Sequence, residues 1–126
     1  MWKKALTLLP VMLLLAGCAT NTITNLSAQR QIRNANNLYP IEVSLDSRQQ
    51  ALKWETVQPT VILGTETYPM RPVKYMQNRW ECLVPVPANV NSVSYHYKFD
   101  YQVSGFGGPK KSSASSHTYK LLIVEP

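Results

Sequence analysis

Residues 92–104 form a strictly alternating stretch that restricts the fold of this 126-residue chain more than any other feature. Every second side chain of SVSYHYKFDYQVS is large and apolar, and these are Val93, Tyr95, Tyr97, Phe99, Tyr101 and Val103. The side chains between them are polar. Alternation with a period of two places one set on each face of a strand, whereas a helix repeats every 3.6 residues. The pattern predicts a long antiparallel strand with one buried face and one solvent-facing side.

Shorter alternating stretches indicate further strands, at residues 39–45, 60–63, 79–87 and 118–124. The stretches are separated by residues that interrupt strands, namely Pro40, Pro59, Pro69, Pro72, Pro85, Pro87 and a glycine-rich segment near Gly105. After the first 17 residues we find no helical apolar stripe, and only a turn is expected over 49–53. Short strands separated in this way are typical of an all-β sandwich.

The last two predicted strands are expected to pair as a hairpin. A register with Tyr101 opposite Tyr119 also places Phe99 opposite Leu121. The large side chains of both strands then share one face, as burial requires. This register leaves residues 107–114 as the tip of a loop.

The first 18 residues have the features of an export signal rather than of a folded segment. Lys3 and Lys4 supply positive charge, and residues 5–16 are almost entirely apolar. This apolar run is too short to span a bilayer as a helix, which takes about 20 residues. It ends in Leu15-Ala16-Gly17-Cys18, with small residues beside the cysteine.

This ending resembles the lipobox of bacterial lipoproteins. The resemblance implies that the Cys18 thiol receives a diacylglycerol, that residues 1–17 are removed as a signal peptide, and that the new amine is acylated, for example with palmitate. Because Ala19 rather than aspartate follows the cysteine, the resemblance also implies sorting to the outer membrane. The alternative is an ordinary secretory signal with an incidental cysteine.

Removal of residues 1–17 leaves 109 residues, enough for one domain. Of the 13 Lys and Arg residues, Lys3 and Lys4 belong to the signal, and the remaining 11 exceed the seven acids by four. These charges are scattered, so nucleic acid is not an expected partner. With Cys18 acylated, Cys82 has no partner for an intramolecular disulfide. Its apolar neighbours favour an inert buried thiol over a nucleophile.

The domain organisation that follows has three parts: residues 1–17 as signal peptide, 18–37 as the lipidated N-terminus, and 38–126 as the sandwich domain. Residues 19–37 are polar and rich in asparagine. Two interpretations stay open for them: a tether between lipid and domain, or a first strand at 22–26.

The order VILG, YPM, RWECLVPVP and VSYHYKFDYQV within residues 61–103 resembles immunoglobulin-like sandwiches, including carbohydrate-associated modules. The resemblance implies a single immunoglobulin-like antiparallel β-sandwich. No glucan-binding position matches residue by residue, so the resemblance transfers no binding site.

Catalytic signatures are missing from the sequence. We find no Gly-x-Ser-x-Gly, no His-Glu-x-x-His and no phosphate-binding glycine loop. In the expected hairpin register, His96 and His117 stand more than about 20 Å apart, too far for one metal or one catalytic pair. We therefore expect no enzyme, no metal site and no cofactor.

The segment GFGGPKKSSASS, residues 105–116, contains the candidate contact residues Phe106, Lys110 and Lys111. It is expected to be mobile and to be either a plain solvated loop or a contact loop for a partner. Trp54 is either a core anchor or a platform for sugar stacking. The expected function is that of a membrane-anchored envelope lipoprotein, a non-enzymatic binding or structural accessory component. The alternative is a carbohydrate-binding module on the outer membrane, and the expected partners are membrane lipid through Cys18 and an envelope protein or glycan.

Overall fold

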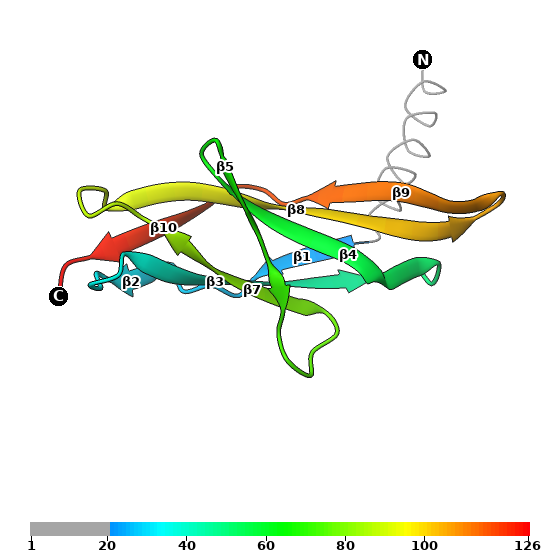
Figure 1. Ribbon diagram of the computed structural model, residues 1–126, viewed down its shortest axis with the longest axis horizontal. Coiled ribbons are helices and arrows are strands. Elements are labelled where there is room, and N and C mark those ends of the chain that lie inside the picture. The colour runs from blue at the N-terminus through cyan, green and yellow to red at the C-terminus, as the bar shows by residue number, and fades with distance from the viewer. Residues whose placement is uncertain (1–20) are drawn as a thin grey trace, which may run out of the picture.

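The computed structural model describes residues 21–126, and all regular elements in this range are β-strands. The strands are β1 (Asn21–Asn25), β2 (Arg30–Ile32), β3 (Leu38–Ser47), β4 (Leu52–Leu63), β5 (Glu66–Pro69), β6 (Arg71–Pro72), β7 (Arg79–Pro85), β8 (Ser92–Gly105), β9 (Gly108–Ser115) and β10 (Tyr119–Val124). They form two sheets that lie one above the other in Figure 1. The prediction of an all-β sandwich is confirmed.

The strand order is that of an immunoglobulin-like sandwich. The first sheet has the order β1-β3-β7-β6, which corresponds to strands A, B, E and D of that fold. The second sheet has the order β2-β10-β8-β4-β5, in which β10, β8, β4 and β5 correspond to G, F, C and C′. The neighbours pair antiparallel, except that β2 pairs parallel with β10.

The core lies between the two sheets and contains the side chains that the alternation assigned to it. Tyr95, Tyr97, Phe99 and Tyr101 of β8 are buried, and Ser94, Lys98 and Asp100 are exposed. Strands β3 and β7 contribute Tyr39, Ile41, Val43, Leu45, Trp80 and Val84 from the opposite sheet. The ring of Trp80 packs edge-on against Phe99 with centroids 5.5 Å apart, a favoured aromatic geometry.

The expected hairpin register is wrong by six residues. Tyr119 lies opposite Tyr95, not Tyr101, and Leu121 lies opposite Val93. The buried face was nevertheless assigned correctly, because a shift by an even number of residues keeps every side chain on its face. Alternation therefore fixed the faces of both strands but not their alignment.

The expected mobile loop at 105–116 is also wrong, because most of it is strand β9. Residues 108–115 pair with β8 from Lys98 to Gly105. The chain passes residues 116–118 and then pairs with the start of β8 as β10. Backbone hydrogen bonds along this ladder offset the entropy of ordering the serines and glycines. Because Lys110 and Lys111 are held in this ladder, we do not expect a protease to cut there readily.

Residues 21–32 are part of the sandwich, so the interpretation of residues 19–37 as one long tether is wrong. Strand β1 pairs with β3, from Asn21 opposite Ser47 to Asn25 opposite Val43. Strand β2 then joins the other sheet. The predicted first strand at 22–26 is found one residue earlier, and the sandwich extends to the N-terminal side of residue 38.

The inward face of β1 carries Ile23, which packs against the core, between two asparagines that meet tyrosine hydroxyl groups from the other sheet. The Asn21 side-chain amide donates to the Tyr101 hydroxyl at 2.9 Å. The Asn25 amide donates to the Tyr95 hydroxyl at 2.8 Å, and the Tyr97 hydroxyl donates to Asn25 Oδ1 at 2.6 Å. These hydrogen bonds hold β1 to the second sheet as well as to β3.

Two prolines expected to interrupt strands lie inside them. Pro40 is in β3, where β1 no longer pairs and the Gln31 amide donates to the Pro40 carbonyl at 3.0 Å. This stretch of β3 is locally an edge, and an edge position tolerates the missing N–H group. Pro59 is in β4, next to an irregularity in the pairing with β8.

Candidate functional site

Strand β4 carries an irregularity that opens the surface of the second sheet. Lys53 lies opposite Gln102 and Gln58 lies opposite Asp100, so four residues of β4 stand against the single residue Tyr101. Thr56 closes this bulge: its hydroxyl donates to the Lys53 carbonyl at 2.6 Å and accepts from the Gln102 N–H at 2.9 Å. Bulges of this kind bend a strand and redirect its side chains.

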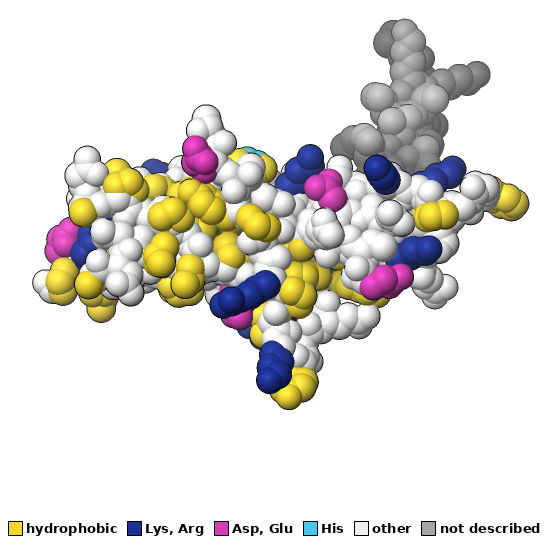
Figure 2. All heavy atoms as spheres, in the orientation of Figure 1, with side chains coloured by type: hydrophobic (Ala, Val, Ile, Leu, Met, Phe, Trp, Pro, Cys, Tyr) yellow, Lys and Arg dark blue, Asp and Glu magenta, His cyan; other side chains and the backbone are white. Residues whose placement is uncertain are grey.

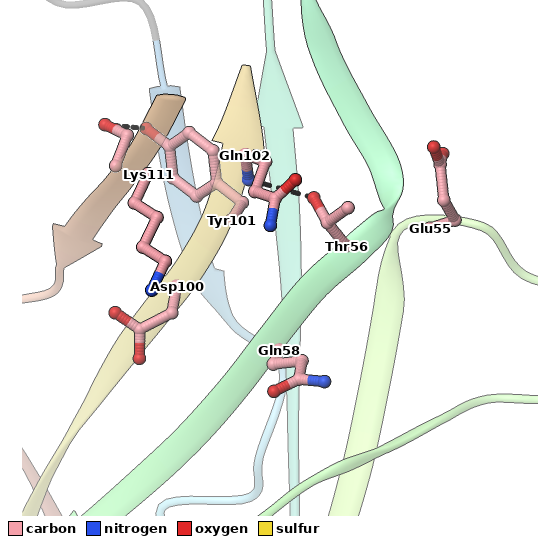
Figure 3. A pocket seen from close by; sticks show the side chains of 8 residues that line it. Glu55, Thr56, Gln58, Asp100, Tyr101, Gln102 and Lys111 are labelled. Carbon is pink, nitrogen blue, oxygen red and sulfur yellow. Dashed lines mark hydrogen bonds between the residues drawn. The ribbon is translucent and has the colours of Figure 1, made fainter. Parts of the chain in front are cut away.

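The bulge borders a surface cavity of about 530 Å³, which we call the polar hollow. Its lining comes from β4, β8 and β9 and consists of Glu55, Thr56, Gln58, Asp100, Tyr101, Gln102, Lys111 and Ser112. Figure 3 shows the Lys111 side chain extending toward Asp100, while Glu55 stands apart at the bulge.

The chemistry of the polar hollow suits hydrogen bonding. Within residues 21–126, the side chains of Glu55, Gln58, Gln102 and Lys111 form no hydrogen bond with other protein groups. Asp100 makes an exposed ion pair with Lys98 at 4.0 Å, a contact that contributes little to stability. Glu55 and Asp100 extend in different directions (Figure 3), so the hollow does not present two carboxylates as an acid–base pair.

The polar hollow was missed in the sequence, although a signal for it exists. In the sequence of β4, the apolar residues Leu52 and Trp54 stand at even positions, whereas Val57, Pro59 and Val61 stand at odd positions. A change of parity within one strand indicates an odd number of extra residues, here three, because side chains of a regular strand alternate strictly.

Trp54 stands in the bulge and is half-buried against the core. Of the two interpretations left open for this residue, the structure supports the core anchor. A tryptophan held in this way offers only part of its ring to a sugar.

The hairpin tip, residues Gly105–Gly108, contains the predicted contact residue Phe106. The Phe106 side chain is fully exposed (101%). Gly107 and Gly108 have φ angles of +83° and +112°, which glycine adopts without steric cost. Two residues therefore suffice to turn the chain from β8 into β9.

The predicted contact residues Lys110 and Lys111 lie on β9 and are both exposed. Lys110 lies opposite Val103 and Lys111 lies opposite Gln102. Neighbouring residues of a strand point to opposite faces, so the two ammonium groups leave the hairpin from its two sides. Lys111 borders the polar hollow and Lys110 does not.

The expected wide separation of the two histidines is wrong, because it depended on the hairpin register. Ser115 lies opposite Lys98 and Tyr119 lies opposite Tyr95, so His117 lies alongside the His96–Tyr97 part of β8. The ring of His117 packs on Tyr119 with centroids 4.4 Å apart. In residues 21–126 we find no group of three or more His, Cys, Asp or Glu residues that could hold a metal ion.

Cys82 is half-buried on β7, between core residues. Burial raises the pKa of its thiol to about 11, while the nearby Arg71 acts in the opposite direction. A thiol with such a pKa is almost entirely protonated at neutral pH and is a poor nucleophile. Cys18, the predicted lipidation site, lies outside the described residues.

Comparison with protein-family models, curated proteins and solved structures finds no match for this chain. In the range 21–126, no helix is long and apolar enough to cross a membrane.

Proposed function

We propose that this protein is a lipoprotein of the bacterial cell envelope, anchored in the outer membrane through Cys18, and that its sandwich acts as a non-enzymatic binding or structural accessory. The anchor is the acylated cysteine of the lipobox-like sequence Leu15-Ala16-Gly17-Cys18. A lipid with several acyl chains gives stable attachment, because each buried methylene contributes about 0.8 kcal/mol.

The observation that supports this proposal most is where the sandwich starts. Strand β1 begins at Asn21, only three residues after the cysteine of the predicted cleavage site. Its first residue is already hydrogen-bonded to Tyr101 of the other sheet. A signal peptide cut before Cys18 would therefore leave the folded domain intact and place it directly at the membrane.

Substitution of the predicted anchor tests this function. Cys18→Ser is expected to abolish incorporation of labelled palmitate and to block cleavage of the leader, as seen by a gel shift. Ala19→Asp is the matched variant: it should keep both acylation and cleavage but move the protein to the inner-membrane fraction. A membrane-bound, mature product from Cys18→Ser would contradict the lipoprotein assignment.

The polar hollow supports a second candidate function, carbohydrate binding. It presents two carboxylates, two amides, an ammonium and hydroxyl groups in one open cavity, an arrangement suited to the hydroxyl groups of a sugar. Because Trp54 stands in the bordering bulge, its fluorescence should report a bound glycan.

Titration with cell-wall glycan fragments tests this second function. Fluorescence changes that saturate in the wild type and disappear in the Gln58→Ala, Gln102→Ala double variant would support it. Lys120→Ala changes an exposed residue of β10 outside the lining and should titrate like the wild type. An unchanged titration in the double variant, or no response of the wild type, would exclude glycan binding in the polar hollow.

A further inference from the structure

The hairpin tip lies beyond the end of the sandwich at which β1 begins, and the predicted anchor Cys18 precedes β1 by only three residues. We propose that the tip inserts Phe106 into the surface of the bilayer that holds Cys18, and that Lys110 and Lys111 contact its anionic headgroups. This inference rests on the proposed function, since it requires a lipid on Cys18.

The direction of the chain supports this arrangement. Strands β1 and β8 run antiparallel across the sandwich, with Asn21 against Tyr101 and Asn25 against Tyr95 and Tyr97. The first residue of β1, Asn21, is therefore at the end of that strand nearer to the tip. Figure 1 shows the tip at one end of the long axis and the C-terminus at the other.

The short connection to the anchor brings the tip to the membrane. Cys18 precedes Asn21 by three residues, which span at most about 11 Å. Phe106 follows Tyr101 by five residues, or about 16 Å of strand at about 3.3 Å per residue. With the hairpin upright, even a fully extended connection from Asn21 would leave Phe106 roughly 5 Å beyond the level of Cys18. The domain cannot stand on its anchor in this orientation without placing the tip among the lipids.

The side chains of the hairpin fit these depths. Apolar residues of interfacial segments lie roughly 5–10 Å into the headgroup boundary, the region that Phe106 reaches. Lys110 lies opposite Val103, which is about 10 Å behind the tip, near the headgroups. Long lysine side chains can bring their ammonium groups to phosphates at this level. Figure 2 shows hydrophobic atoms at the far right end of the molecule and dark blue side chains behind them.

Because the protein is already anchored, a single aromatic side chain is sufficient to hold the hairpin tip in the bilayer. A free domain would gain little from inserting a single Phe106. A short tether instead keeps the tip near the bilayer at an effective concentration on the order of millimolar. Weak insertion then fixes the orientation of a protein that is already attached.

The chain contains a matched control for this insertion. Tyr75 is nearly as exposed as Phe106 (92%), and it also has a lysine beside it, with Lys74 Nζ 5.3 Å from its ring centre. It lies in the connection between β6 and β7, which projects from the side of the molecule in Figure 1. Insertion of the tip leaves Tyr75 in water.

Tryptophan quenching in reconstituted vesicles tests the inference. The acylated, mature protein is placed in vesicles of phosphatidylethanolamine and phosphatidylglycerol whose acyl chains carry bromine. We expect Phe106→Trp to show a blue-shifted emission and a larger loss of intensity than the wild type. Tyr75→Trp should be quenched no more than the wild type, which reports only Trp54 and Trp80. Lys110→Ser with Lys111→Ser, added to Phe106→Trp, should lower the quenching.

The outcomes separate this inference from the function on which it rests. Equal quenching of Phe106→Trp and Tyr75→Trp in a palmitate-labelled, vesicle-bound protein would overturn the insertion but leave the lipoprotein assignment standing. A protein without palmitate would overturn the assignment itself. Quenching that is the same in phosphatidylcholine vesicles and unaffected by the lysine substitutions would overturn the role of the two lysines.

Discussion

The body of the sandwich and the β8–β9 hairpin share one strand but differ in what covers it. From Tyr95 to Tyr101, the apolar side chains of β8 face the first sheet and are at most 5% exposed. Further along the same strand, Val103 is half-buried, and Phe106 beyond it is fully exposed. The alternation continues through Val103, whereas Phe106, which follows Gly105, is out of phase with it. Alternation therefore reports the direction of a side chain, whereas burial depends on whether the opposite sheet covers it.

The largest expected effect is in the body. Phe99→Ala removes a fully buried ring that packs against Trp80, and it should lower the free energy of unfolding by about 3–5 kcal/mol. Lys98→Ala, on the outward face of the same strand, should change it by less than about 0.5 kcal/mol. Urea unfolding measures both. Similar losses in the two variants would contradict the one-sided burial of β8.

The reactivity of two thiols, one in the body of the sandwich and one introduced on the hairpin, extends this comparison. Because burial raises the pKa of Cys82 to about 11, its reaction with maleimide at neutral pH should be roughly 100-fold slower than that of an ordinary thiol. The rate should rise only as the pH approaches about 11. A cysteine introduced by Ser113→Cys, on the exposed face of β9, should react at the ordinary rate. Fast labelling of native Cys82 would show that the body opens at β7.

Loss of the hydrogen bonds between β1 and β8 should have an intermediate effect. Asn25→Ala leaves the Tyr95 and Tyr97 hydroxyl groups without this partner, at an expected cost of about 1–3 kcal/mol. On a Tyr97→Phe background the same substitution should cost less, because one of the two hydroxyl groups is already gone. Urea unfolding of the four proteins measures the coupling, and strict additivity would argue against the contact.

The smallest expected effect is at the hairpin tip. Phe106→Ser changes a side chain that no other part of the sandwich covers, so the free energy of unfolding should change by less than about 0.5 kcal/mol. The same substitution should reduce the attachment of the tip to vesicles. A large loss of stability in solution would show that Phe106 packs on the domain and that the two regions differ less than described.

The sequence predicts the direction of the side chains in a strand better than it predicts which strands pair. Alternation assigned Tyr97, Phe99 and Leu121 to the core correctly, because a period of two is a local property. It could not align β8 with β10, since even shifts preserve the faces. Residues 108–115 looked like a loop because serine and glycine have low strand propensity, but pairing with β8 overrides propensity.

The candidate sites were predictable only in part. Phe106 was singled out as the one large apolar side chain among glycines and serines, and it is fully exposed. The polar hollow was not predicted, because Glu55, Asp100 and Lys111 come from three strands that only the bulge and the register bring together. Residues 19–37 were taken as a tether or as containing a first strand at 22–26, since Asn21 and Asn25 find partners only in tyrosines that lie far along the chain.

The pairing of β1 also sets how the domain would withstand mechanical force. In the proposed lipoprotein, a pull between the membrane and a bound partner enters the domain at Asn21 and runs along β1. The ladder from Asn21–Ser47 to Asn25–Val43 lies across that direction, so its hydrogen bonds would be sheared together rather than broken one after another. The Asn21–Tyr101 and Asn25–Tyr95 contacts pass part of the force to the second sheet. A domain attached in this way resists unfolding under a pull on its anchor, although each single hydrogen bond is weak.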